Sequence, residues 1–176
     1  IKSSKRKIIW VGNGAKFATE EINLFIKMGF AVVTSTQGRG VVSETNKMCL
    51  GAFNAVPLIE EFYKTLDLML IVGSRLRGHE TRDMSLELPK NLVQIDIDPN
   101  AKNRTYKTNQ FHCGDAKKVL AELAKRLDGK IPVEKQWINE VSDLKNQIYL
   151  DYKNMLGAYK DFPEIIRNVL PKDGKW

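Results

Sequence analysis

Cysteine and histidine are scarce in this chain of 176 residues, which contains two of each. Cys49 and Cys113 lie far apart, and His79 and His112 are isolated, so none of them follows the spacing of a metal site. We therefore expect two free thiols in a reducing compartment and predict no metal ligands. The chain also has no apolar run of about 18 residues and no signal peptide pattern. These absences predict a cytoplasmic protein without a membrane partner.

Positive charge is in excess but is not concentrated in one region. The 28 Lys and Arg residues against 21 Asp and Glu give a formal net charge of +7. The basic residues are scattered, except for a terminal cluster of Lys2, Lys5, Arg6 and Lys7 that has no interleaved aromatic residues to stack on bases. Solvated helix faces explain this pattern better than nucleic-acid binding does. We predict no nucleic-acid partner.

No recognisable catalytic arrangement appears either. The sequence has no nucleophile–base pair and no metal constellation. Asp96 and Asp98 have no histidine or metal ligand near them in sequence that would make them a catalytic dyad. We predict no catalytic residues, and the residues alone indicate a binding domain without chemistry of its own.

What the chain does contain is an alternation of apolar strands and amphipathic helices. Its apolar content of 43 % is enough for a full core. Strands are predicted at 7–11, 30–34, 68–72, 92–97 and 110–113, and helices at 18–29, 58–66 and 116–127. Near-continuous apolar strands that alternate with helices are typical of a parallel sheet covered on both faces. The predicted fold class is therefore α/β, a doubly wound parallel sheet in three layers.

Glycine-rich or acidic segments follow these strands. Gly12-Asn13-Gly14 follows the first strand, Gly38-Arg39-Gly40 the second, Gly73 to His79 the third and Gly114-Asp115 the fifth. Ligands of open α/β sheets bind at these carboxyl ends, but each motif is also explained as a tight turn or, for Asp115, as a helix N-cap. Phe17 stands where a dinucleotide fingerprint has its third glycine. This departure disfavours an ordinary dinucleotide dehydrogenase.

The fourth strand ends in the run Ile95-Asp96-Ile97-Asp98-Pro99. Proline stops the strand because it has no N–H for the ladder. An acid at the carboxyl end of a buried parallel strand is where α/β proteins hold the hydroxyls of a nucleotide ribose. The alternative is that both carboxylates only cap the loop that follows, and this motif by itself leaves both interpretations open.

The character of the sequence changes beyond Gly129. Ile131-Pro132 breaks the pattern, and helices are predicted at 137–155 and 162–170. We expect a nucleotide-binding-like domain at 1–130, a linker helix at 131–155 and the truncated start of another domain at 156–176. Because the chain begins at Ile1 and stops at Trp176 just after a loop-like segment, we expect it to be a piece of a longer protein.

Six short motifs occur in one order along residues 7–127: VGNGA, VVTSTQGRG, LGAF, LMLIVGSRL, VQIDIDP and CGDAKKVLAEL. Together they resemble the central domain of thiamine-diphosphate-dependent enzymes, and most closely the acetolactate synthase large-subunit type. The resemblance implies a six-stranded, Rossmann-like sheet related to the NAD/FAD-binding domain of deoxyhypusine synthase. It also implies that this domain braces two catalytic domains and has no catalytic role alone.

The same resemblance implies a larger parent protein, a 2-oxoacid decarboxylase or carboligase. Its pyrimidine-binding and pyrophosphate-binding domains would be the partners of this one, and residues 156–176 would open the pyrophosphate-binding domain. Thiamine diphosphate and Mg²⁺ would bind outside the present chain. The parent would be a homo-oligomer that acts on a small 2-oxoacid.

By resemblance, one set of residues would face the phosphates and flavin of a bound cofactor. Gly12-Asn13-Gly14 would face the phosphates or the ribityl chain, and Ser35-Thr36 would lie beside them. Gly51-Ala52 would lie near the flavin.

A second set would hold the adenosine half. Gly73 and Arg75 would flank it, Asp96-Ile97 would hold the ribose and adenine, and Gly114-Asp115 would close over the adenine. The position of the aspartate motif in the ordered set also assigns Asp98 to the turn into Pro99.

The chain departs from the flavin-binding pattern at two motifs. It has Gly12-Asn13-Gly14 where that pattern has three glycines, and Arg75 to His79 where it has an acid-rich run. FAD, ADP, a CoA-like ligand and an empty site therefore stay open as alternatives. Two other functions stay open as alternatives: a self-contained NAD-dependent enzyme of the sirtuin or deoxyhypusine synthase type, and a non-enzymatic module with a vestigial nucleotide site.

Overall fold

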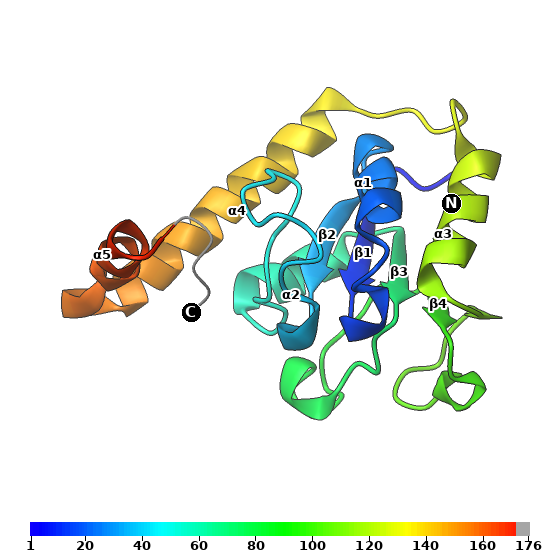
Figure 1. Cartoon of the computed structure of the whole chain (residues 1–176), viewed down its shortest axis with the longest axis horizontal. Helices are drawn as coiled ribbons and strands as arrows, with labels where there is room; N and C mark the ends of the chain where they lie inside the picture. Colours follow the sequence, from blue (N-terminus) through cyan, green and yellow to red (C-terminus); the bar gives the residue numbers. More distant parts are fainter. Residues whose placement is uncertain (172–176) are drawn as a thin grey trace.

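A parallel sheet forms the centre of the structure, a computed structural model that describes residues 1–171 (Figure 1). Its five strands are β1 (Lys7–Val11), β2 (Ala31–Thr34), β3 (Leu68–Val72), β4 (Leu92–Asp96) and β5 (Gln110–Cys113). Their order is β2-β1-β3-β4-β5, and every neighbouring pair is parallel. The first three strands are buried throughout, which explains their unbroken apolar sequences. The predicted α/β class and its parallel sheet are confirmed.

The sixth strand that the resemblance implied is reduced to a single parallel bridge between Cys49 and Val32 of β2. Three backbone hydrogen bonds of 2.8, 2.8 and 3.0 Å join residues 48–51 to β2. The pairing stays short because the segment leaves a turn at Asn46 and bends away at Gly51, where φ is +79°. With this segment counted third in chain order, the sheet has the common doubly wound order 3-2-1-4-5-6.

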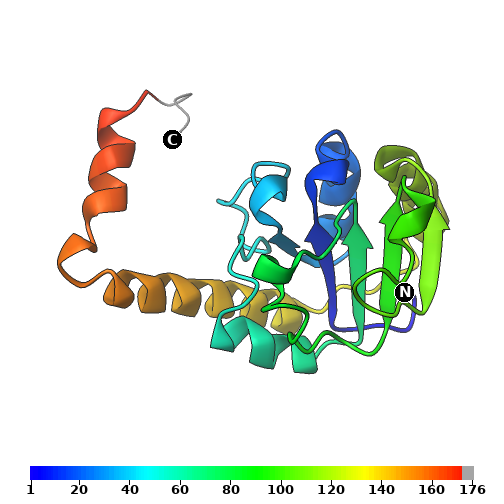
Figure 2. The same ribbon diagram turned by 90° about the horizontal axis from the view of Figure 1, so that it is seen from below.

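Helices cover the sheet on both faces, as Figure 2 shows. Alternate strand residues point to opposite faces, so Ile9 and Val11 belong to one core and Ile8 and Trp10 to the other. The first core is closed by α1 (Thr19–Lys27) and α3 (Ala116–Leu127), and the second by α2 (Pro57–Lys64) and α4 (Lys135–Met155). The three-layer arrangement that the sequence predicts is present.

The helix α4 begins as part of the second core rather than as a free connector. Trp137 is buried, its indole N–H donates to the carbonyl of Gly29 at 2.7 Å, and its ring stacks on Phe62 with centroids 5.5 Å apart. Val141 and Ile148 are buried on the same side of the helix. The first four turns of the predicted linker helix are therefore packed on the sheet domain.

An arginine at the start of β1 holds the same end of α4. The Arg6 guanidinium donates to both carboxylate oxygens of Glu140, at 2.7 and 2.5 Å, and lies 4.9 Å from the centroid of the Trp137 ring. The hydrogen bond from Arg6 lowers the pKa of Glu140. A bidentate pair placed against an aromatic ring fixes both position and orientation.

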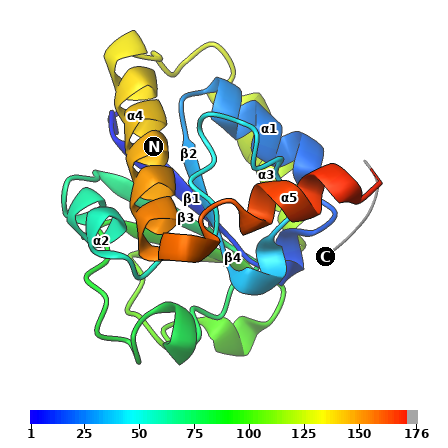
Figure 3. The same ribbon diagram turned by 90° about the vertical axis from the view of Figure 1, so that its left-hand side faces the viewer.

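The last helix, α5 (Phe162–Val169), stands off from the sheet beyond the end of α4 (Figure 2). Figure 3 looks from the α5 side, so α5 lies in front of the sheet domain in that view. None of its residues is buried, and its apolar Phe162, Ile165 and Val169 are exposed. Lys153 and Tyr149 of α4 contact Glu164, at 3.2 and 2.8 Å. The end of the predicted segment 156–176, from residue 172, lies outside the described residues.

Five one-turn helices complete the elements of the described residues, 1–171: η1 (Asn13–Ala15), η2 (Thr36–Gly38), η3 (Gly78–Glu80), η4 (Pro99–Ala101) and η5 (Gly157–Tyr159). The first four lie in the connections that follow β1 to β4. None of the helices within residues 1–171 combines the length and apolarity needed to span a bilayer.

Trp137→Ala should lower the free energy of unfolding by about 3–5 kcal/mol, because it removes a fully packed aromatic ring and leaves the Gly29 carbonyl without its donor. Urea denaturation measures this change. Tyr159→Ala is the matched control, because Tyr159 is 71 % exposed and its loss should change stability by about 0.5 kcal/mol or less. Equal effects from the two variants would show that α4 is not part of the folded core.

Candidate functional site

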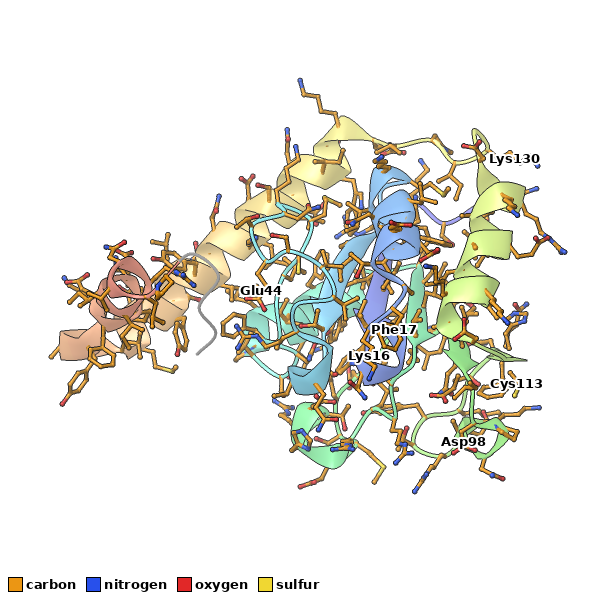
Figure 4. All side chains as sticks on the ribbon, viewed as in Figure 1. Lys16, Phe17, Glu44, Asp98, Cys113 and Lys130 are labelled. Carbon is orange, nitrogen blue, oxygen red and sulfur yellow. The ribbon has the colours of Figure 1, made fainter. Side chains whose placement is uncertain are left out.

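A cavity of about 400 Å³ opens at the carboxyl ends of the strands. The loops that follow all five strands contribute to its lining. The chain passes from β1 to β2 on one side and returns to β3 on the other, so the cavity lies at the switch point where doubly wound sheets bind ligands. Figure 4 marks Asp98 at this edge and Lys130 at the opposite end of α3.

Ten of the thirteen predicted site residues line this cavity. They are Asn13, Gly14, Ser35, Thr36, Gly73, Arg75, Asp96, Ile97, Gly114 and Asp115. They come from five separate loops, so the fold brings together residues that are up to about a hundred positions apart in sequence. The other three, Gly12, Gly51 and Ala52, lie outside the lining.

Gly12 lies beneath the cavity, where the loops after β1 and β3 touch. Its backbone N–H donates to Val72 at 2.8 Å, and a Cβ on Gly12 would stand only 2.2 Å from the carbonyl oxygen of Gly73. Gly14 donates to the same oxygen at 3.0 Å, and Gly73 has a φ of +58°. The glycines of the first motif are thus required by a backbone-to-backbone contact.

Gly51 and Ala52 are separated from the cavity. Gly51 ends the short segment that pairs with the outer side of β2, and Ala52 follows it. Gly51 lines a second cavity of about 260 Å³ between this segment, α4 and α5. Cys49, in the same segment, is buried, and this burial raises the pKa of its thiol. The structure therefore does not bring the residues expected near a flavin to the main cavity.

Asp96 enters the cavity from the end of β4. Its Oδ1 accepts a hydrogen bond from the backbone N–H of Asp98 at 3.0 Å, while no hydrogen bond within residues 1–171 uses its Oδ2. Asp98 accepts from the N–H of Asn100 at 2.9 Å and begins η4. The assignment of Asp98 to the turn is confirmed, and the Oδ2 of Asp96 is left without a hydrogen-bond partner among the described residues.

Two other polar side chains of the lining hold their own loops. Asp115 is the N-cap of α3, accepting from the N–H of Lys118 at 3.0 Å, which confirms the structural interpretation of this residue. Ser35 accepts from the N–H of Gly38 at 2.9 Å and begins η2 in the same way. The geometry of both loops is therefore fixed before any ligand arrives.

Two arginines, Arg75 and Arg77, supply positive charge to the cavity. Both lie in the loop after β3, both are exposed, and neither guanidinium makes an ion pair or hydrogen bond within residues 1–171. A guanidinium presents a planar fork of donors that matches phosphate oxygens bidentately. Arg77 therefore belongs to the cavity as much as Arg75 does.

The structure adds Glu80 to the lining, a residue that no sequence pattern singles out. It is buried, and its Oε1 accepts a 2.7 Å hydrogen bond from the backbone N–H of Thr36. Thr36 and Glu80 are forty-four residues apart in sequence, so no local sequence pattern predicts this contact. Gln37, Ser74 and Ala116 are further lining residues that sequence reasoning missed.

The charged residues of the lining do not form a metal site. Within residues 1–171, no three His, Cys, Asp or Glu side chains are grouped so that they could hold a metal ion. The polar groups of the lining are therefore two guanidinium groups, one unpaired carboxylate oxygen of Asp96 and the backbone of the loops. Groups of this kind can form hydrogen bonds with a small polar molecule.

Residues 1–123 match the family model described as thiamine pyrophosphate enzyme, central domain. The chain belongs to this family. It is 29 % identical over 161 residues to a probable acetolactate synthase large subunit of Methanococcus aeolicus, covering 82 % of this chain and 27 % of that protein. The acetolactate synthase large subunit of Buchnera aphidicola is 26 % identical over 181 residues, covering 98 % of the chain and 31 % of that protein.

A relative with a different printed activity matches about equally well. The probable 2-ketoarginine decarboxylase of Pseudomonas aeruginosa is 25 % identical over 174 residues, covering 98 % of the chain and 31 % of that protein. The chain spans less than a third of the length of these relatives. The resemblance to the central domain of acetolactate-synthase-like proteins is confirmed.

Gly12→Ala should lower the free energy of unfolding of this chain by about 3 kcal/mol, because the added methyl group would lie 2.2 Å from the Gly73 carbonyl oxygen and 2.6 Å from the Ser74 Cα. Gly40→Ala is the control, because Gly40 has open space around it and its cost, about 1–2 kcal/mol, comes only from a φ of +82°. Thermal unfolding of the two variants compares the cost of a steric clash at residue 12 with the cost of a positive φ at residue 40. Equal losses would mean that the contact with Gly73 is loose.

Proposed function

We propose that this chain is the central domain of a thiamine-diphosphate-dependent 2-oxoacid decarboxylase or carboligase, and that its cavity binds an adenine nucleotide. The family match and the printed activities of the relatives support the first part. The second part rests on the cavity, whose volume of about 400 Å³ falls within the range of about 300–1,000 Å³ that small-molecule sites occupy.

The observation that carries the nucleotide proposal is that two unpaired arginines and an unpaired carboxylate oxygen line the same cavity at the switch point. The guanidinium groups of Arg75 and Arg77 suit a diphosphate. The free Oδ2 of Asp96 suits ribose hydroxyls, as an acid at the end of such a strand does in other doubly wound sheets. Ile97, which is 71 % exposed at the rim, offers an apolar surface to the adenine ring.

ADP and FAD both contain this adenosine diphosphate unit, and the residues of the cavity fit it. Asp96-Ile97 and Gly114-Asp115 would hold the adenosine, and Arg75 would lie where the adenosine meets the diphosphate. Asn13 and Gly14 with Ser35-Thr36 would border the phosphates. Gly12 would not touch the nucleotide; it allows the loop after β1 to pack against the loop after β3 beneath the cavity. Gly51-Ala52 has no place in this proposal, because it lies outside the lining.

The thiamine diphosphate and Mg²⁺ of the parent belong, in this proposal, to its other domains. When bound there, thiamine diphosphate supplies an electron sink for decarboxylation of the 2-oxoacid. The residues of the present chain take no catalytic part. Their task is to bind and orient a nucleotide and to brace the neighbouring domains.

The proposal places the partners of this domain in the same chain. A domain at 1–130 carries the cavity, the helix at 131–155 is fixed to it, and 156–176 begins the pyrophosphate-binding domain. The exposed apolar residues of α5 support this, because contiguous apolar surface of this kind needs a covering partner. A cytoplasmic homo-oligomer is the proposed parent, in keeping with the two free cysteines.

The comparisons do not support the alternative functions. Every relative described above carries the printed name of an acetolactate synthase large subunit or of a 2-ketoarginine decarboxylase, and the family model is that of a thiamine pyrophosphate enzyme. Neither a self-contained NAD-dependent enzyme nor a module with a vestigial site gains an observation in its favour.

Isothermal titration calorimetry of the chain with ADP tests the proposal. Asp96→Asn should weaken ADP binding about tenfold or more, because the amide keeps the Oδ1 acceptor for the Asp98 N–H but replaces the free carboxylate oxygen with a donor. Asp128→Asn is the control at the far end of α3, and it should bind like the unchanged protein. If ADP, FAD, CoA and NAD all fail to bind the unchanged chain, the nucleotide proposal is wrong.

A further inference from the structure

Charge is divided unevenly among the loops that line the main cavity. The loops after β4 and β5 contribute three carboxylates to the lining and no basic side chain: Asp96, Asp98 and Asp115. The basic side chains of the lining all come from the loop after β3, which also carries Glu80: Arg75, Arg77 and His79. The cavity therefore has an acidic end, formed by the loops after β4 and β5.

Asp96 is the most buried carboxylate of this acidic end. It is 9 % exposed, whereas Asp98 is half-buried and Asp115 is exposed. The N–H of Asp98 holds its Oδ1 at 3.0 Å. Its Oδ2 has no partner within residues 1–171 and is not among the side-chain atoms there that are shut off from solvent, so it is accessible from the cavity. A donor placed at Oδ2 would satisfy a largely desolvated acceptor, whereas an anion would meet a charge that little water screens.

No positive group at this end of the cavity neutralises Asp96. Its side chain makes no ion pair within residues 1–171. The N-terminus of α3, which could attract an anion here, is already capped by Asp115, whose carboxylate accepts from the N–H of Lys118 at 3.0 Å. Doubly wound sheets that accept a phosphorylated ribose place an arginine near it, whereas those that accept a plain ribose place an acid. The lining from the loop after β4 has the acid and no arginine.

We propose that Asp96 is a specificity-determining residue that admits adenine nucleotides with both ribose hydroxyls free and rejects those with a phosphate on the ribose 2′ or 3′ oxygen. This inference rests on the proposed nucleotide function. A hydroxyl donates to the Oδ2 of Asp96, whereas a phosphate ester brings only further negative charge to it. CoA, which carries a 3′-phosphate on its adenosine, and NADP, which carries a 2′-phosphate, are therefore excluded from the cavity.

Three ligands that differ only at the ribose test this proposal by calorimetry on the full chain: ADP, 2′-deoxy-ADP and 3′-phosphoadenosine 5′-diphosphate. Asp96→Asn removes the charge and keeps an acceptor oxygen for the N–H of Asp98. Asp128→Asn is the matched control, because it makes the same change in net charge at the far end of α3. The comparison of variants therefore separates a local effect of Asp96 from the general attraction of a basic protein for a more negative ligand.

The unchanged chain should bind ADP about thirtyfold or more tightly than 3′-phosphoadenosine 5′-diphosphate, because the added phosphate meets an uncompensated carboxylate. It should bind 2′-deoxy-ADP about tenfold more weakly than ADP, because one donor to a charged acceptor is lost. In Asp96→Asn the affinity for ADP falls while that for the 3′-phosphorylated ligand does not, so the preference should shrink to about threefold or less. Asp128→Asn should keep the full preference.

The outcomes distinguish this inference from the function on which it rests. If the unchanged chain binds ADP and its 3′-phosphorylated form equally well, or if Asp96→Asn keeps the full preference, the role of Asp96 is overturned and the nucleotide function stands. If Asp96→Asn binds too weakly to measure, 2′-deoxy-ADP on the unchanged chain decides: an affinity equal to that of ADP overturns the role, and a tenfold loss supports it. If the unchanged chain binds none of the ligands, the proposed function itself is wrong.

Discussion

The close contact between the loops after β1 and β3 is the constraint on which the rest of the site depends. No side chain separates them: the space above Gly12 is occupied by the carbonyl of Gly73, and Gly14 donates to the same oxygen. This contact lets two adjacent strands end at one level while the chain turns to opposite sides of the sheet. Gly14 and Gly73, which meet in this contact, line the cavity, and the loops after the other strands surround them.

The sequence was most informative where the physics is local or continuous. Unbroken apolar runs identified the strands, and the caps at Asp98 and Asp115 were foreseen because each side chain bonds a residue two or three positions ahead. The implied sixth strand is limited to residues 48–51, because a turn at Asn46 precedes the segment and Gly51, with a positive φ, ends it. Glu80 was beyond prediction, since its partner Thr36 is set by the arrangement of two loops.

The cavity and the helix that leads away from the sheet belong to one folded unit. One end of the sheet carries the cavity, while the α4 helix is fixed across the second face by Trp137 and by the Arg6–Glu140 pair. The same helix carries α5 and its exposed apolar residues away from the sheet. The packing of α4 on the sheet fixes the direction in which the chain leaves the domain, and any ligand that bound only the folded state would stabilise this arrangement.

The most direct measurement is a crystal structure of the chain grown with ADP. The account predicts ADP at the carboxyl ends of the strands, with a ribose hydroxyl within hydrogen-bond distance of Asp96 Oδ2, the diphosphate facing Arg75 and Arg77, and Glu80 still bound to Thr36. ADP bound elsewhere, or turned so that its adenine lies beside Glu80 and its phosphates beside Asp96, would contradict it.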